Sequence, residues 1–315
     1  QVLQKASWRI INTHYFVPAD MEKQKKAYLF AAMVVLLWAT AASAFKISLR
    51  HIDVFSLLFY ASIVSTAVFF VHLLLSKKLS LLRTLSRSDY LRSALLGFLN
   101  PFLYYTVLFK AYSLLPAQEA QPLNFIWPIM LVLLSIPLLG QKIGSRDILA
   151  TFICFAGVVV ISTHGDILGF KFTNITGVCL ATGSSIIWAL FWIYNVRDRR
   201  DETVRMFLNF AFGSAITFLS MLLFAGESIP GPEGLLGAAY VGLFEMGITF
   251  LLWLKALKLS KTTAHVTNLI YLVPFLSLVV ISLAVGEKIL PSTAVGLVFI
   301  VAGIVLQKLR GRRPI

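Results

Sequence analysis

Long apolar segments dominate this chain of 315 residues and limit what it can fold into. A helix that crosses the hydrocarbon core of a bilayer needs roughly 20 mostly apolar residues. Short connections join ten segments that meet this need: 27–45, 54–75, 91–109, 117–139, 147–163, 175–196, 204–225, 234–254, 264–285 and 291–308. The sequence therefore predicts an all-α membrane protein with ten transmembrane helices.

The composition argues against a water-soluble enzyme or a nucleic-acid-binding protein. Hydrophobic residues make up 58% of the chain and charged residues 13%, whereas soluble domains are about 45–50% apolar and about 25% charged. The sequence contains no GxxxxGK[ST] motif that would bind a nucleotide. Cys154 and Cys179 have neither disulfide nor metal-ligand spacing, so we expect no cofactor and no metal site.

Lysine and arginine are distributed unevenly between the connections. If successive connections lie on opposite sides of the membrane, 21 of the 28 basic residues fall on one side and 5 on the other. The remaining two, Lys5 and Arg9, lie in the first twenty residues. Because basic loops stay on the cytoplasmic side, we expect both termini to be cytoplasmic, which requires an even number of spans. The basic tail 309–315 is interpreted as a topology anchor, with no nucleic-acid partner.

The first twenty residues differ from the rest of the chain. Residues 1–26 are expected to form a leader and a cytoplasmic N-terminus, and Met21 is a plausible native start because a Lys-rich stretch and the first span follow it. We interpret residues 1–20 as an extension that is not native. An interfacial helix is the alternative.

The two halves of the chain are similar. Pro128–Gly157 aligns without gaps onto Pro274–Gly303, matching Gly-x-Lys-Ile and Ala-Gly pairs. Each half, 27–163 and 175–308, therefore contains five spans, and an odd number inverts the second copy across the membrane. Inverted repeats are typical of secondary transporters, with the substrate site near the membrane midplane. Small residues seven positions apart in both copies should let helices pack closely, namely Ala150, Gly157, Gly296 and Gly303.

Several of these features resemble the EamA-type drug/metabolite transporter superfamily. They are Trp38 and Trp188 in the first span of each half, the Lys-Ala pairs before the fourth and ninth spans, and the Gly140 and Gly286 tails. The segment Asn124–Pro128 is similar to the Asn-Tyr-Leu-Trp-Pro signature of the aromatic-amino-acid exporter branch, with Phe125 and Ile126 as departures. The resemblance implies an exporter of amino acids or related metabolites in the bacterial inner membrane, with a central cavity that opens alternately to each side.

Polar side chains inside the spans are costly in lipid, so each needs a partner or a cavity. Gln121, Asn124 and Pro128 share one face of the fourth span, and Pro128 should free the carbonyl of Asn124. Asn124 either lines a cavity or joins two helices by hydrogen bonding. The other residues expected to line the cavity are Trp127, Asn100, Tyr104, Asn268, Tyr271, Trp38 and Trp188.

Glu245 lies at the centre of the eighth span, deeper than any other acid, and its counterpart in the first half is Asn100. We expect Glu245 to line the cavity and to bind a substrate amine or carry a coupled proton. The alternative is a protonated Glu245 that only holds helices together. Glu119 and its counterpart His265 are further residues for proton coupling, unless they are solvated helix ends.

The sequence thus predicts a secondary transporter with a small-molecule substrate and the lipid bilayer as partners. Another metabolite or a drug is an alternative substrate, and the oligomeric state stays open. An intramembrane enzyme is a distant alternative, because such an enzyme needs a clustered catalytic set. No two acids share a predicted span.

Overall fold

The computed structural model describes residues 18–139, 145–166, 173–226, 230–260 and 268–308, and these contain helices and no strand. The first half of the chain comprises α2 (Pro18–Ser48), α3 (Val54–Leu75), η1 (Leu79–Thr84), α4 (Arg87–Gly97), η2 (Phe98–Leu103), α5 (Tyr104–Leu114), α6 (Ala117–Asn124), α7 (Trp127–Leu139) and α8 (Ser145–Ser162). The second comprises α9 (Ile175–Arg197), α10 (Glu202–Phe224), α11 (Pro232–Tyr240), η3 (Val241–Gly247), α12 (Ile248–Leu259), η4 (Asn268–Leu272), α14 (Val273–Val280), η5 (Ile281–Val285) and α15 (Pro291–Lys308). The predicted all-α class is confirmed for the described residues.

Seven stretches of the described chain are long and apolar enough to cross a membrane: Met21–Ser48, Val54–Leu75, Arg87–Leu114, Ala117–Leu138, Ile175–Asn195, Glu202–Phe224 and Pro232–Leu259. Three shorter apolar stretches accompany them: Ile148–Ser162, Leu269–Val285 and Pro291–Leu306. Each of these stretches overlaps one predicted segment. The protein is therefore a multi-pass membrane protein, and the count of ten crossings stays a prediction.

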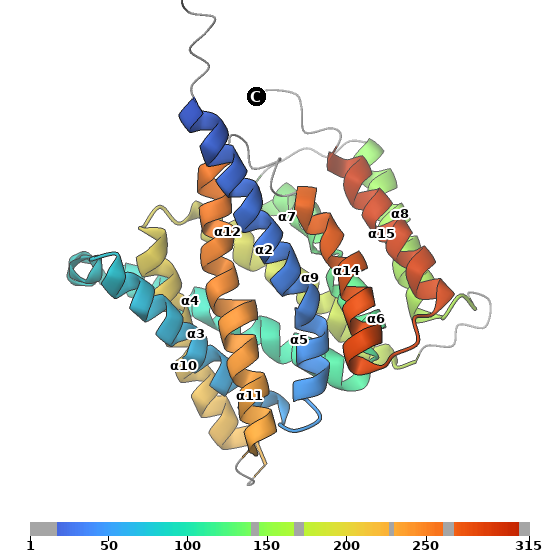
Figure 1. Cartoon of the computed structure of the whole chain (residues 1–315), viewed down its shortest axis with the longest axis horizontal. Coiled ribbons are helices and arrows are strands. Elements are labelled where there is room, and N and C mark those ends of the chain that lie inside the picture. Colours follow the sequence, from blue (N-terminus) through green and yellow to red (C-terminus); the bar gives the residue numbers. More distant parts are fainter. Residues whose placement is uncertain (1–17, 140–144, 167–172, 227–229, 261–267, 309–315) are drawn as a thin grey trace, which may run out of the picture.

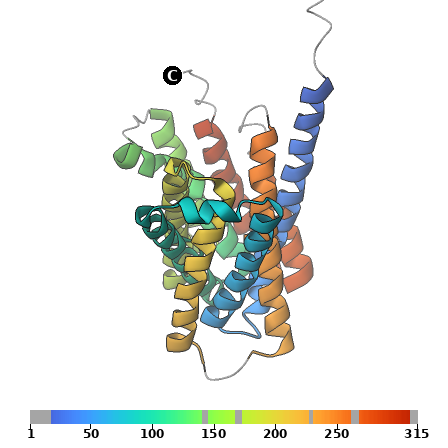
Figure 2. The ribbon, with the colours of Figure 1, turned by 90° about the vertical axis from the view of Figure 1, so that its left-hand side faces the viewer.

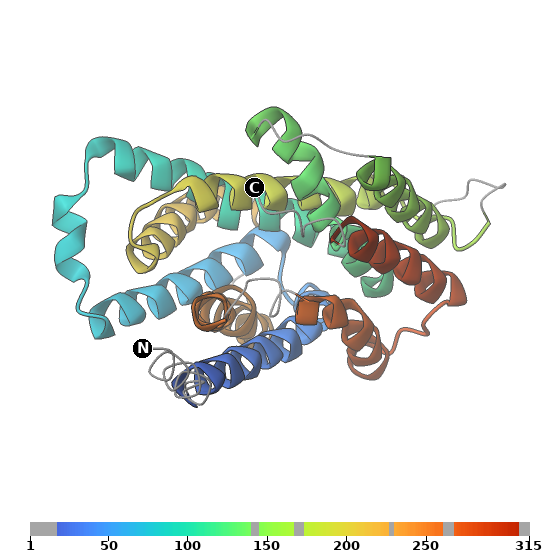
Figure 3. The same ribbon diagram turned by 90° about the horizontal axis from the view of Figure 1, so that it is seen from above.

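The helices form one bundle in which the start of α2 and the end of α15 lie at the same end (Figures 1 and 2). We call this end the terminal end and the opposite one the distal end. Seen from above, α8 and α15 pack together on one side of the bundle, whereas α3 and α10 lie on the other (Figure 3). The short η1 helix joins α3 to α4 at the edge of the bundle (Figure 3).

Helices in both halves are interrupted by π-helical turns. In the first half η2 contains Pro101, and Asn100 has a non-helical backbone with φ −150° and ψ 119°. In the second half η3 carries Glu245, the residue that the sequence register pairs with Asn100. The two halves therefore interrupt corresponding helices at corresponding residues.

The fourth predicted span differs from its expected form. The sequence predicts one helix over 117–139 with a carbonyl freed by Pro128, but the structure ends α6 at Asn124 and begins α7 at Trp127. Pro128 is the second residue of α7, where its missing N–H costs no helical hydrogen bond. The chain thus turns at Phe125 and Ile126 instead of running through a kinked helix.

Glycines allow helices α8 and α15 to pack closely against each other. A Cβ atom on Gly157 would lie 2.5 Å from the Gly296 carbonyl oxygen, and one on Gly303 would lie 2.7 Å from the Ala150 carbonyl oxygen. Such distances leave no room for a side chain. The close packing predicted for these four small residues is confirmed, and it follows the rule that small residues let membrane helices approach closely.

The connections at the terminal end are held by charge pairs. Arg200 makes a bidentate contact with the buried Asp198 and donates to the Asp89 carbonyl oxygen and the Ser93 hydroxyl at 2.6 and 2.9 Å. Burial opposes ionisation of Asp198, but the hydrogen bonds from Arg200 outweigh it and hold its pKa below the usual value. A depressed pKa stabilises the fold above the usual carboxyl pKa, and this stability is lost as the pH falls through the folded-state value.

The glycine contact gives a stability test. Gly157→Ala forces a methyl group against the Gly296 backbone, so we expect it to lower the free energy of unfolding by about 1–3 kcal/mol. Gly183→Ala in α9 is the matched control, because a Cβ atom there has no neighbour within 4 Å. Thermal unfolding in detergent measures both. Equal melting temperatures for the two variants would contradict the packing described here.

Candidate functional site

Two sets of hydrogen bonds lie in the core of the bundle, and they meet at the neighbouring residues Tyr104 and Tyr105. The Tyr105 hydroxyl donates to Glu245 Oε1 at 3.1 Å, and the rings of Tyr104 and Tyr105 are 4.7 Å apart in an edge-to-face arrangement. The Tyr104 hydroxyl donates to Asn124 Oδ1 at 3.3 Å, and Asn124 Nδ2 donates to Ser184 Oγ at 2.8 Å. We call these five residues the polar chain. It joins α5 and α6 of the first half to α9 and η3 of the second.

The position of Glu245 follows from close packing around η3. A Cβ atom on Gly242 would lie 2.5 Å from the Ala61 carbonyl oxygen, so α3 lies directly against η3. Ser65 Oγ of α3 donates to the Gly242 carbonyl oxygen at 2.9 Å. Helix α3 thus fixes one side of η3, and Glu245 faces Tyr105 of α5.

Glu245 is 8% exposed, and its Oε2 atom has no hydrogen-bond partner among the described residues. An unpaired polar atom of a carboxyl group in a membrane interior is costly. A substrate amine, a hydroxyl or a proton on Oε2 would remove that cost. The carboxyl group is therefore both buried and incompletely satisfied, which suits a binding or proton-carrying role.

A second buried polar group without a partner among the described residues is the Asn100 amide in η2. Asn100 is fully buried, and neither atom of its amide has a partner in the described part of the chain. Asn209 of α10 has the same property. A Cβ atom on Gly97 would lie 2.3 Å from the Asn209 carbonyl oxygen, so α4 and α10 are in close contact just before Asn100.

Aromatic rings surround the polar chain. Trp188 lies 4.6 Å from the Tyr104 ring and 5.9 Å from Phe250, and Trp38 lies 6.4 Å from the same Phe250. The two tryptophans predicted from the repeat therefore contact one shared ring, one from each half. Trp38 Nε1 is buried without a partner among the described residues.

The remaining predicted residues are dispersed. Gln121 is buried with Oε1 unpartnered, whereas Trp127, Pro128 and Tyr271 are partly buried, and Trp127 and Tyr271 pack on the hydrophobic core. The structure connects Glu245, Tyr104 and Asn124 through the polar chain. His265 and the Asn268 side chain lie outside the described residues.

Glu119 belongs to a separate cluster at the distal end. It is fully buried instead of solvated, and its Oε1 lies 2.7 Å from His164 Nε2 and accepts from Thr173 Oγ at 3.2 Å. Its Oε2 has no partner among the described residues. Glu119 and Glu245 therefore do not form a carboxylate pair.

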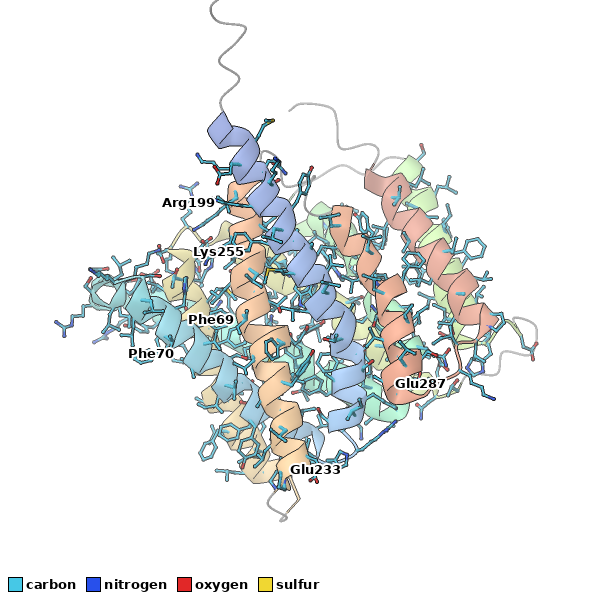
Figure 4. The ribbon with its side chains drawn as sticks, in the orientation of Figure 1. Phe69, Phe70, Arg199, Glu233, Lys255 and Glu287 are labelled. Atoms are coloured by element: carbon cyan, nitrogen blue, oxygen red, sulfur yellow. The ribbon has the colours of Figure 1, made fainter. Side chains whose placement is uncertain are left out.

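The distal end is closed by further polar contacts. Glu287, labelled in Figure 4, accepts from the backbone N–H groups of Ala117 and Gln118 at 2.8 and 3.0 Å, which is favourable at the start of α6. Lys46 Nζ of α2 donates to the carbonyl oxygens of Tyr112 and Leu115 at 2.8 and 2.6 Å, at the end of α5. The distal contacts thus tie α2, α5 and α6 to the η5–α15 connection.

Sequence reasoning missed Tyr105, Ser184 and His164. Each was visible as a polar residue in or beside an apolar segment, but small hydroxyls and tyrosines are common in such segments. Their importance comes from which helix faces them, and that depends on the packing of distant segments. No group of three or more His, Cys, Asp or Glu able to hold a metal occurs in the described part of the chain.

Comparisons with known proteins agree with the architecture. A model of the EamA-like transporter family matches residues 25–163 and again residues 175–307. An uncharacterized transporter of Archaeoglobus fulgidus is 26% identical over 285 residues, which cover 89% of this chain and 96% of that protein. One crystal structure matches with a TM-score of 0.64 at 24% identity, covering 92% of this chain and 98% of that chain, and this likeness shows the fold alone.

Two of the similar proteins have names that state a substrate. The aromatic amino acid exporter YddG of Ancylobacter novellus is 27% identical over 216 residues, covering 67% of this chain and 74% of that protein. A probable terminal-alkyne amino-acid exporter of Streptantibioticus cattleyicolor is 27% identical over 297 residues, covering 92% and 97%.

The contact between Tyr105 and Glu245 gives a second stability test. Tyr105→Phe removes the hydroxyl that donates to Glu245, so we expect a loss of about 1–3 kcal/mol in unfolding free energy. Tyr112→Phe on the same helix is the control, because it removes a hydroxyl that does not bind Glu245. Thermal unfolding in detergent compares them. Equal melting temperatures for Tyr105→Phe and Tyr112→Phe would mean that the hydrogen bond to Glu245 does not stabilise the fold.

Proposed function

Because the chain belongs to the EamA-like transporter family, we propose that it is a secondary transporter that exports amino acids or related small metabolites across the bacterial inner membrane by alternating access. The family and the named relatives are transporters and exporters, not enzymes. The protein is therefore embedded in a membrane and moves a small-molecule substrate. The substrate class, the direction and the cycle are the parts that we propose.

The inverted-repeat topology is supported by several independent features. The family model matches once in each half. The described chain begins and ends at the same end of the bundle (Figure 1), as an even number of crossings requires. The interruptions η2 (98–103) and η3 (241–247) overlap in the register that pairs Asn100 with Glu245. Ten crossings, with both termini in the cytoplasm, account for all three features.

The polar chain is the observation that carries the proposed transport site. It runs from Glu245 to Ser184 and joins helices of both halves, where an alternating-access transporter binds its substrate. A substrate ammonium group would complete the bonding of Glu245 Oε2, and the amide of Asn124 would bind a carboxylate or hydroxyl. The rings of Trp188 and Tyr104 pack 4.6 Å apart beside these groups, and aromatic surroundings suit an amino acid with an apolar side chain.

Proton coupling is assigned to the same carboxyl group. Glu245 binds either a proton or the substrate amine and releases one when it binds the other. Either of them gives the Oε2 atom the partner that it lacks among the described residues. Glu119, bound to His164 at the distal end, is a second proton-carrying group on the way out of the bundle. His265 remains a proposed partner in this role on the basis of the repeat alone.

Another metabolite or a drug is the alternative substrate. The cluster of Trp38, Trp188 and Phe250 favours it, because aromatic side chains also bind planar molecules without an amino group. Uptake of labelled amino acids and of aromatic drugs into vesicles that contain the purified protein would separate the two substrate classes.

The role of Glu245 is tested by Glu245→Gln, which keeps the shape and the hydrogen bond but removes ionisation. We expect transport to fall at least tenfold, or to lose its pH dependence, with folding unchanged. Glu233→Gln is the control, because Glu233 is an exposed acid in the same stretch, Pro232–Leu259. The assay is proton-driven substrate flux in reconstituted vesicles. A fully active Gln variant that still responds to pH would overturn the assigned role.

The topology is tested by short epitope tags at both termini. The distribution of basic residues predicts that both tags are accessible only from the cytoplasmic side. Protease protection in spheroplasts and in inverted vesicles measures this accessibility. A C-terminal tag reached from the outside would mean an odd number of crossings.

A further inference from the structure

An apolar groove of about 460 Å³ opens between α3 and α12. Six residues of α3 between Val64 and Leu75 form one wall, and Leu243, Ile248 and Leu251 form the other. Apart from His72, the lining side chains are hydrocarbon. The volume lies within the range of small-molecule binding pockets, yet the groove offers almost nothing for a polar ligand to bind.

The groove exists because α3 and α12 diverge. Both helices meet at η3, where a Cβ atom on Gly247 would lie 3.2 Å from Val68 of α3. Towards the terminal end α3 leans away from α12 (Figures 1 and 3). The opening therefore starts beside η3 and extends to the terminal end of the bundle.

The length of the groove matches one leaflet of a bilayer. The wall from Val64 to Leu75 rises about 16 Å at 1.5 Å per helical residue. The hydrocarbon core is about 30 Å thick, so this wall covers about half of it. An open hydrocarbon groove of this length in a membrane fits one acyl chain.

Positive charge gathers where the groove ends. Lys255 lies one helical turn beyond Leu251, towards the terminal end (Figure 4), and its charge acts on His72 of the groove together with Lys78 and Lys258. Lys77 follows Leu75 by two residues and is exposed. Salt bridges connect Lys78 to Asp201 at 2.6 Å and Lys258 to Glu202. The described ion pairs include neither Lys77 nor Lys255, and Lys255 Nζ lies 5.9 Å from the centre of the Phe30 ring, which leaves its charge without an acidic partner.

The adjoining η1 helix has the composition of a membrane-interface segment. Leu79 and Leu81 are 44% and 37% exposed, and the exposed Arg83 lies beside them. Basic and apolar side chains side by side are typical of segments that lie among lipid headgroups. The terminal end of the groove is thus at headgroup depth.

We propose that this groove binds one anionic glycerophospholipid from the leaflet at the terminal end. One acyl chain lies between α3 and α12, and the phosphate group binds Lys255 and Lys77. Leu243 and Ile248 of the groove flank Glu245 in sequence, so the bound chain packs against the same turn that carries the buried carboxyl group. This lipid site is independent of the substrate that the protein transports.

Native mass spectrometry of the purified protein tests the proposal. The protein is mixed with equal amounts of phosphatidylglycerol and phosphatidylcholine that carry the same acyl chains. We expect the first retained lipid to be phosphatidylglycerol. The preference for it should fall about fivefold for each lysine removed in Lys77→Gln and Lys255→Gln. Lys110→Gln, an exposed lysine at the distal end of α5, should leave the preference unchanged.

A second variant tests the groove itself. Ala67→Trp fills the groove from an exposed position, so the first phosphatidylglycerol should be lost. Ala32→Trp, at an exposed alanine of α2 outside the groove, should retain it. Equal retention of both lipids by the parent protein would overturn the proposal. An unchanged preference in Lys77→Gln/Lys255→Gln would also overturn it, and misfolding would not explain that result because both positions are exposed. The same retention of phosphatidylglycerol in Ala67→Trp as in Ala32→Trp would overturn it as well.

Discussion

A bilayer interior supplies no hydrogen bonds, so each polar group that a helix carries into it must find its partner within the protein. This constraint explains why Glu245, Tyr104 and Asn124 lie in one connected series and not on the lipid-facing surface. The bonds of that series join four helices from both halves. Glu245 Oε2 and the amide of Asn100 are among the buried polar atoms that have no hydrogen-bond partner in the described bundle, so a ligand could bind to them. We place the substrate there for the same physical reason.

Different kinds of contact join the helices at the two ends of the bundle. At the distal end Glu287 and Lys46 bind backbone groups at the ends of α6 and α5, and Glu119 binds His164. At the terminal end charged side chains bind each other, as in the contacts of Arg200 with Asp198 and of Lys78 with Asp201. The alternating-access cycle that we propose would have to break each set in turn. The terminal set would respond to salt and acid, because it consists of ion pairs near water.

Much of the fold could be predicted from the sequence, because helix position depends on local apolar content and on glycine and proline. Helix α3 has the predicted limits 54–75, and Gly157 and Gly303 pack as the repeat suggested. The site was predicted less completely. Glu245 and Asn124 stand out as polar residues in apolar segments, but Tyr105 and Ser184 become partners only through the rotation of distant helices. The sequence left open whether Glu119 is a solvated helix end, because its partner His164 comes from another connection.

Side-specific labelling of one cysteine measures the central claim directly. Ser184→Cys places a thiol in the polar chain, in a background where Cys154→Ala and Cys179→Ala remove the two native thiols. A membrane-impermeant maleimide is added to either side of sealed vesicles, with and without an amino-acid gradient. Alternating access through the polar chain predicts that the thiol reacts from both sides, and that reversing the gradient changes which side reacts faster. A thiol that reacts from neither side, or from one side under every condition, would contradict the account.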